Sequence, residues 1–406
     1  MQPTRWTTTG AIVLAAASTA WSQPTLVTRA AAVAAAVARG PRLAVARTDS
    51  AAASAAVGLA RRFENPVIGI QRTESTPHEH YTLEVPLDLP WLRSVRVGSA
   101  RSALGAASWR LAFEREAVAF DADTAYTRAL VQAARSRLSA RSARNADSLL
   151  VLARLRRDAG DASDLDVELV TVTAGQLTNA AAVDSLEATT ALLALQALMG
   201  MASAEPAIAL TDTLDLPDAP RASAPAAGVP LLIAAAQADA RAAELAVSLE
   251  RRRVIGAPSL SIGYETGDPG GTGSRRLPSI GIALPLPLFN RNGAAIRGAE
   301  AQRDRAAALL VLARIEQAAA LARAQRALAV ARERAARSGR LVAGADRVAV
   351  LSLLAYREGA AALPAVLAAQ RTAREALAQY LDDVASARTL HGFVRLLSLN
   401  AGRFEP

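Results

Sequence analysis

The chain contains an internal repeat, and this feature restricts its possible folds more than any other. Three landmarks of the first half return in order in the second, at offsets of about 192, 199 and 199 residues: 65–66 as 257–258, 83–89 as 282–288, and Gly160 as Gly359. Ordered matches at nearly one offset indicate a tandem duplication. Each half is therefore expected to contain the same elements in the same order.

The boundaries follow from where the repeat begins and ends. A Pro-, Ala- and Ser-rich stretch lies between the halves, which is typical of a linker. We predict a first repeat over 23–202, a linker over 203–228, a second repeat over 229–400 and a short tail over 401–406. Each repeat is predicted to contain a helix (25–62 in the first), two strands, a very long helix and a shorter return helix.

Two strands per repeat are predicted from period-two alternation of apolar residues. The first set places Tyr81, Leu83, Val85, Leu87, Leu89 and Trp91 on one face, and the second places Ile280, Ile282, Leu284, Leu286 and Leu288 on one face. Strands of about 9–11 residues would be long enough to cross a bilayer at a tilt. Because proline cannot donate to a strand ladder, Pro86, Pro285 and Pro287 are expected where the strands turn into the following helices.

The long helical runs cover about 93–158 and 294–357, and the return runs cover 163–199 and 363–399. Sixty-odd helical residues give a rod of roughly 95 Å. Larger apolar residues recur in the first run with steps of seven and eleven, a stripe that stays almost straight. The periodicity alone is equally typical of a coiled-coil stalk.

Composition excludes several classes of function. Cysteine is absent, which rules out disulfides, thiolate metal sites, cysteine nucleophiles and a lipidated N-terminal cysteine. No catalytic constellation is visible, so the chain is predicted not to be an enzyme and to need no cofactor or metal. The cluster at 78–80 (HEH) is predicted to be an exposed polar loop, with a surface metal site as the less favoured alternative.

The net charge of +9 comes entirely from arginine, because lysine is absent. Nucleic-acid binding is one interpretation. We favour biased use of arginine over lysine, since the arginines are scattered along helical segments among acidic residues. No dense basic run and no aromatic stacking platform accompanies them. No nucleic-acid partner is therefore predicted.

The N-terminus has the pattern of an export signal. Arg5 precedes a short apolar stretch and then small residues around 18–22, which predicts a signal peptide over 1–22. The alternative is a frayed helix. The stretch is too short to span a bilayer, and no later segment reaches spanning length.

Strand counting constrains the assembly. Four strands cannot close a barrel, and an open sheet edge in lipid would leave backbone N–H and C=O groups without partners. Several chains must therefore pool their strands if the sheet enters a membrane. We predict a mostly α fold with a small β part, in which antiparallel helical hairpins form an α-barrel and four strands contribute to a shared outer-membrane β-barrel.

At four places the sequence resembles the TolC-type outer-membrane efflux channels: 65–66 (NP), 284–293 (LPLPLFNRNG), 356–359 (YREG) and 367–371 (LAAQR). The second motif is most similar to the heavy-metal cation (CzcC-like) branch. The resemblance implies a homotrimer with a twelve-stranded barrel in outer-membrane lipid. It also implies a passive exit duct that receives substrates from an inner-membrane pump through a periplasmic adaptor protein. A periplasmic adaptor or coiled-coil scaffold is the alternative.

The resemblance also implies functional residues at the helical turns. Gly160, Ser163, Gly359 and Ala362 would lie at the periplasmic tip and contact the adaptor, the alternative being tight turns with no partner. Asp166 and Tyr356 are the candidates for contacts that narrow the aperture, the alternative being a solvated acidic face. The family often has acidic residues just past the second tip glycine, but here alanines occupy those positions, at 365 and 368.

Overall fold

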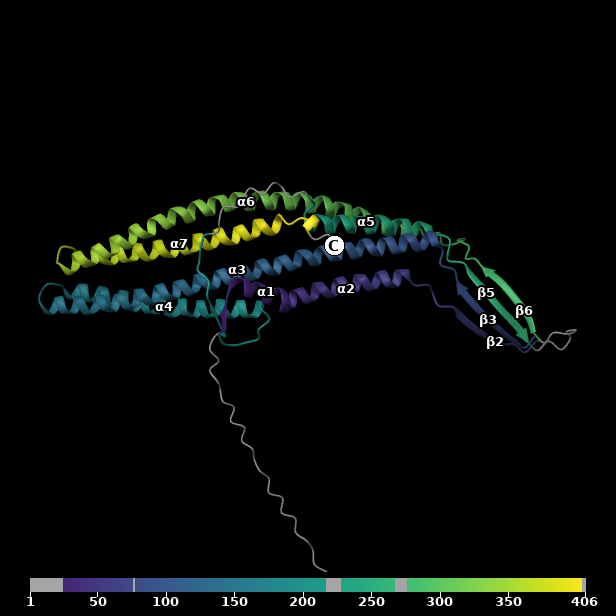
Figure 1. Cartoon of the computed structure of the whole chain (residues 1–406), viewed down its shortest axis with the longest axis horizontal. Helices are drawn as coiled ribbons and strands as arrows, with labels where there is room; N and C mark the ends of the chain where they lie inside the picture. Colours follow the sequence, from purple (N-terminus) through teal and green to yellow (C-terminus); the bar gives the residue numbers. More distant parts are fainter. Residues whose placement is uncertain (1–24, 76, 217–227, 267–275, 404–406) are drawn as a thin grey trace, which may run out of the picture.

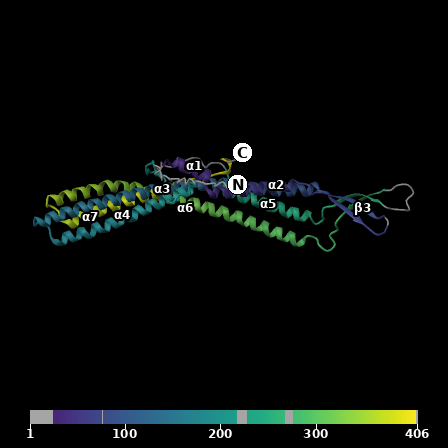
Figure 2. The same ribbon diagram turned by 90° about the horizontal axis from the view of Figure 1, so that it is seen from below.

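The protein is an elongated molecule with helices at one end and a small sheet at the other (Figure 1). The computed structural model describes residues 25–75, 77–216, 228–266 and 276–403. The predicted signal peptide and residues 217–227 of the predicted linker lie outside these residues. The view in Figure 2 shows that both long hairpins share one axis, with the sheet at one end and the two tips at the other.

Two antiparallel helical hairpins form most of the molecule. The first consists of α3 (Pro90–Asp158) and α4 (Asp164–Leu198), and the second of α6 (Gly293–Arg357) and α7 (Leu363–Leu397). The 69 residues of α3 correspond to a rod of about 100 Å. The predicted long and return helices are therefore confirmed, with boundaries within a few residues.

Two shorter helices complete the bundle near the sheet. Helix α2 (Pro41–Arg61) packs on α3, and α5 (Leu231–Arg252) packs on both α3 and α6. Helix α3 therefore contacts α2 and α5 in its first part and α4 and α7 towards the tip. The element order helix, strand, strand, long helix, return helix occurs in both halves of the chain.

The sheet contains four antiparallel strands in the order β2-β3-β5-β6. Strand β2 covers Val67–Arg72, β3 Glu79–Pro86, β5 Ser259–Thr266 and β6 Arg276–Ala283. The β-hairpin β2–β3 of the first half joins the β-hairpin β5–β6 of the second through the β3–β5 pair, where Tyr81 stacks on Tyr264.

The strands are shorter than predicted, with six residues in β2 and eight in each of the others. The prediction that Leu87, Leu89 and Trp91 lie on the strand face is wrong, because β3 ends at Pro86 and α3 already begins at Pro90. Leu284, Leu286 and Leu288 likewise lie after β6. The physical reason is proline, which lacks the N–H that would continue the ladder and is favoured at a helix start.

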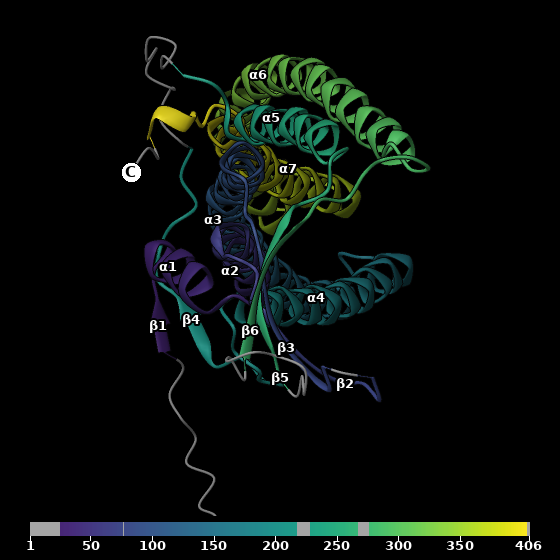
Figure 3. The same cartoon turned by 90° about the vertical axis from the view of Figure 1, so that its right-hand side faces the viewer.

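The N-terminal region differs from the single helix predicted over 25–62. It contains a short strand β1 (Thr25–Val27) and a separate helix α1 (Arg29–Arg39), and Pro41 then begins α2. Strand β1 pairs in parallel with β4 (Ile208–Leu210), which lies within the predicted linker. In the end-on view of Figure 3, both strands lie to one side of the helices, beside α1. Three-residue strands are too short to show an alternating pattern, so periodicity could not predict them.

Among the described residues, Tyr126 of α3 has the largest fully buried side chain, which lies between the N-terminal segment and α4. Its hydroxyl donates a hydrogen bond of 2.9 Å to the carbonyl of Val27, so the tyrosine fixes β1 against the long helix.

The prediction of an exposed polar loop at 78–80 is wrong for two of its three residues. Glu79 and His80 belong to β3, and His80 pairs with Glu265 at 3.2 Å.

Candidate functional site at the hairpin tips

Both hairpins turn through the same backbone motif at the tip. At the end of α3, Asp161 N donates to Arg156 O at 2.8 Å and Gly160 N donates to Arg157 O at 2.9 Å. At the end of α6, Ala360 N donates to Ala355 O at 2.8 Å and Gly359 N to Tyr356 O at 3.1 Å. This pair of bonds is the Schellman motif, which satisfies carbonyls that the helix end leaves free.

Each motif requires a residue with a left-handed backbone. Gly160 has φ of +84° and Gly359 has φ of +75°. A Cβ at Gly160 would meet no atom within 4 Å, and one at Gly359 would meet only the guanidinium of Arg156 at 3.7 Å. The glycines are therefore required by backbone conformation and not by lack of space, and both turns face open solvent.

The return helices begin differently in the two hairpins. Ser163 caps α4 in a capping box: Asp166 N donates to Ser163 Oγ at 3.2 Å, and the Asp166 carboxylate accepts from Ser163 N at 3.1 Å. Ala362 occupies the equivalent position before α7 and provides no side-chain cap. The second tip lacks this polar capping group, so its return helix is fixed by apolar packing of Leu363 and Val366.

Tyr356 lies inside a small apolar core that joins the two hairpins at the tip. It is 4% exposed and packs with residues of α3, α4 and α7. Arg156 of α3 places its guanidinium 4.8 Å from the centre of the Tyr356 ring and donates a 2.7 Å hydrogen bond to the Tyr356 carbonyl. This cation–π contact and charge-assisted bond link the first hairpin to the second.

The structure gives Asp166 and Tyr356 different partners. The hydrogen bonds of Asp166 in the described residues go to Ser163, in its own turn, whereas Tyr356 contacts Arg156. Their predicted role at the aperture stays a prediction. Arg156 was not recognised from the sequence, because nothing in the local pattern shows that an arginine one turn before Gly160 reaches across to the other hairpin.

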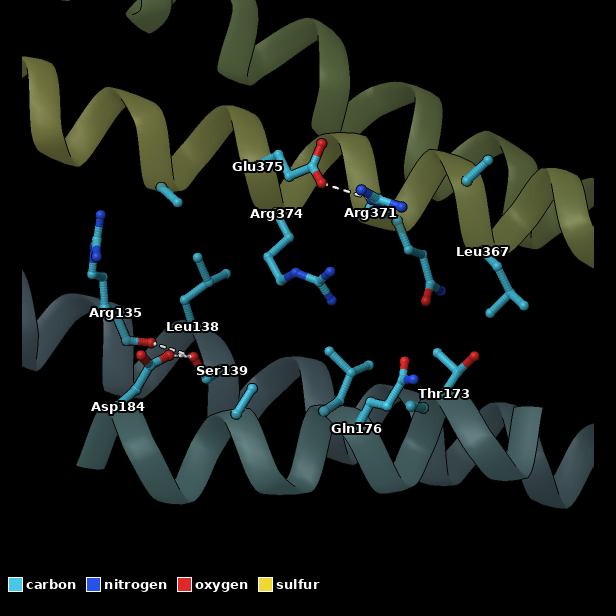
Figure 4. A pocket seen from close by; sticks show the side chains of 16 residues that line it. Arg135, Leu138, Ser139, Thr173, Gln176, Asp184, Leu367, Arg371, Arg374 and Glu375 are labelled. Atoms are coloured by element: carbon cyan, nitrogen blue, oxygen red, sulfur yellow. Dashed lines mark hydrogen bonds and ion pairs between the residues drawn. The ribbon is translucent and has the colours of Figure 1, made fainter. Parts of the chain in front are cut away.

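A groove of about 760 Å³ runs between the hairpins above the tip core (Figure 4). Its walls are α7 on one side and α3 and α4 on the other. Arg374 extends from α7 into the groove towards α4, while the neighbouring Arg371 is held by Glu375 at 2.7 Å. Polar side chains Gln176, Ser139 and Asp184 line the opposite wall.

The tip also exposes large apolar side chains. Leu155 of α3 is 62% exposed, Leu165 of α4 is 67% exposed, and Leu354 of α6 is 53% exposed. Charged groups lie among them, including an Arg157–Asp158 pair at 2.7 Å. Exposed apolar residues rimmed by charges are typical of a surface that another protein covers.

Comparison with known proteins identifies the fold. No protein-family model and no curated protein matches the chain. Among solved structures, the chain is similar to the outer membrane protein VceC from Vibrio cholerae (18% identity, TM-score 0.74, covering 92% of this chain and 96% of that one). It is also similar to the CmeC outer membrane channel from Campylobacter jejuni (14%, 0.78, 91% and 85%) and to a membrane protein from Pseudomonas aeruginosa (21%, 0.77, 91% and 92%).

The chain therefore has the TolC-type fold of outer-membrane efflux channels, as the sequence motifs predicted. The further prediction of the heavy-metal cation branch gains no support from these comparisons. No helix among the described residues combines the length and apolar content needed to cross a membrane.

Proposed function

We propose that the chain is the outer-membrane channel of a tripartite efflux system and acts as a homotrimer. The observation that carries this proposal is the sheet, which no helix covers (Figure 1) and which exposes large apolar side chains on one face. Ile68 and Ile70 are each 72% exposed, and Ile280 and Ile282 are 80% and 75% exposed. A water-soluble sheet would bury such a face.

The two faces of the sheet differ in chemistry. The strand register places Ile68, Leu83, Ile262 and Ile280 in one row on the apolar face. The adjacent row on the other face consists of Gly69, Thr82, Gly263 and Ser279. Apolar residues outside and polar residues inside are the pattern of transmembrane β-barrels. The small residues also allow the sheet to curve towards its polar face, which would line the lumen.

The open edges of the sheet require several copies of the chain, and the resemblance to TolC-type channels implies three. One chain provides four strands with open edges at β2 and β6. Open edges are not tolerated in lipid, so neighbouring chains must pair there. Three copies give a closed twelve-stranded barrel, wide enough for a water-filled passage.

The helical hairpins then extend into the periplasm as the wall of a duct. Their tips, with Gly160, Ser163, Gly359 and Ala362, would receive the hairpins of a periplasmic adaptor docked to an inner-membrane pump. The exposed leucines at the tip support this contact. The pump supplies the energy, and substrates leave by diffusion. An adaptor or scaffold role is not favoured, because neither needs an uncovered apolar sheet.

A charge placed on each face of the sheet tests the membrane assignment. Lysine at Ile280 would lie on the lipid face and cost about 2–4 kcal/mol near the bilayer midplane. Lysine at Ser279, its neighbour on the polar face, is the matched control. We expect I280K to reduce the amount of heat-modifiable trimer in outer-membrane fractions, and S279K to leave it near the wild-type amount. Equal trimer in both variants would contradict lipid contact at Ile280.

A second experiment tests adaptor docking. Tryptophan at Gly160 or Gly359 places a bulky side chain in the tip turn. We expect these variants to export less substrate and still to form trimers. Tryptophan at Gly344, inside α6 and with no atom within 4 Å of its Cβ, controls for bulk elsewhere on the helix. Export at the wild-type rate in both tip variants would contradict the docking assignment.

A further inference from the structure

Each hairpin contains an arginine, a serine and an aspartate at equivalent positions. Arg135, Ser139 and Asp184 belong to the first hairpin. Arg334, Ser338 and Asp383 belong to the second, each exactly one repeat offset of 199 residues later. In both trios the arginine and serine lie one turn apart on the long helix, and the aspartate lies on the return helix. The same arginine–aspartate and serine–aspartate contacts are therefore possible in both hairpins.

In the second hairpin the trio forms a closed network. The Asp383 carboxylate is only 3% exposed and accepts from Arg334 at 2.6 Å, from Ser338 Oγ at 2.5 Å and from Gln379 at 2.9 Å. Three donors around a buried carboxylate compensate for its removal from water. The network joins α6 to α7.

In the first hairpin the same trio is divided. Ser139 Oγ still donates to Asp184, but Arg135 pairs at 2.5 Å with Asp382 of α7, on the other hairpin. The Asp184 carboxylate has no ion pair in the described part of the chain, and its burial raises its pKa. Arg135 also lies close enough to Asp184 for its charge to oppose that rise in pKa.

The two trios also differ in the residue beside the aspartate. Position 180, equivalent to Gln379, is alanine, so the first hairpin lacks this third donor to its aspartate. Ala180, Asp184 and Arg135 all line the groove between the hairpins. Arg135 therefore stands between two carboxylates, one on its own hairpin and one across the groove.

We propose that Arg135 is a two-position switch residue that controls the separation of the two hairpins. Bound to Asp382, as here, it ties α3 to α7 at the upper end of the groove, while Arg156 of α3 contacts Tyr356 of α6 at the tip. Turned to Asp184, it reproduces the pair that Arg334 makes with Asp383 and leaves α7 free. The exchange replaces one ion pair by another, so the number of ion pairs is the same in the two positions. The role of this exchange in opening the duct rests on the proposed function, whereas the exchange itself does not.

Alanine at Asp382 tests the switch directly, with D304A as the control. Asp304 also pairs with an arginine, at 2.7 Å, but lies exposed on α6 away from the groove. In a cryo-electron microscopy structure of D382A in lipid nanodiscs, we expect the Arg135 guanidinium within hydrogen-bond distance of the Asp184 carboxylate. An Arg135 side chain that instead points to solvent, or stays beside position 382, would overturn the proposal.

Cross-linking measures the separation of the hairpins. The chain has no cysteine, so the pair Q176C and R374C, which face each other across the groove (Figure 4), gives a clean bismaleimide reaction. D382A should slow this reaction about two- to fivefold, the range set by one part-exposed ion pair, and D304A should not. An unchanged cross-linking rate in D382A would overturn the proposal that Arg135 controls the separation of the two hairpins. Neither readout requires export, so either failure leaves the channel assignment intact.

Discussion

Replacing Gly160 with alanine should loosen the first tip turn by an amount set by backbone strain alone. The residue has φ of +84°, and an added Cβ would meet no atom within 4 Å. Steric overlap therefore contributes nothing. What remains is the cost of a left-handed conformation in a residue with a side chain, about 1–2 kcal/mol.

Gly175 provides the matched control. It lies inside α4 with ordinary helical geometry, and its added Cβ would also meet no atom within 4 Å. The same chemical change there should stabilise the helix by about 0.5–1 kcal/mol, because alanine loses less conformational entropy than glycine. The two substitutions therefore have opposite predicted signs.

Hydrogen–deuterium exchange of the folded protein measures both effects. The Asp161 amide is held by Arg156 O at 2.8 Å, and it exchanges when the turn opens locally. G160A should speed this exchange about 5- to 30-fold, the factor that corresponds to 1–2 kcal/mol. G175A should leave the Asp161 exchange rate unchanged and slow the amides around position 175. An unchanged or slower exchange at Asp161 in G160A would refute the strain argument.

Further predictions concern buried polar groups. The Tyr356 hydroxyl is buried and has no hydrogen-bond partner in the described structure, so Y356F should keep or raise the protein's melting temperature. Y356A should instead cost about 3–5 kcal/mol of stability through the cavity it leaves. Burial, followed by the charges of Arg332, Arg395 and Arg388, lowers the pKa of His391 below its ordinary value. The unfolded chain therefore binds this proton more tightly, and stability should fall as the pH drops below about 6.5. H391Q should remove that part of the pH dependence in thermal melts; an identical profile would contradict it.

The arrangement of the candidate site could be predicted in part. Glycine between two long apolar-periodic runs predicts a helix reversal, and both turns were located this way. The partners of Asp166 and Tyr356 could not be predicted, because Ser163 competes for the carboxylate within its own turn and Arg156 reaches Tyr356 only once the two hairpins pack together.

The sequence by itself determined the element order and the alternation of the strands, because periodicity, glycine and proline act locally. It also determined that glycine must occupy the tip turns. Only the tertiary structure decided that β1 pairs with β4 across 183 residues, and that Arg135 binds Asp382 while Arg334 binds Asp383. These outcomes depend on which groups meet after the hairpins pack, and equivalent residues in a repeated sequence can then find different partners.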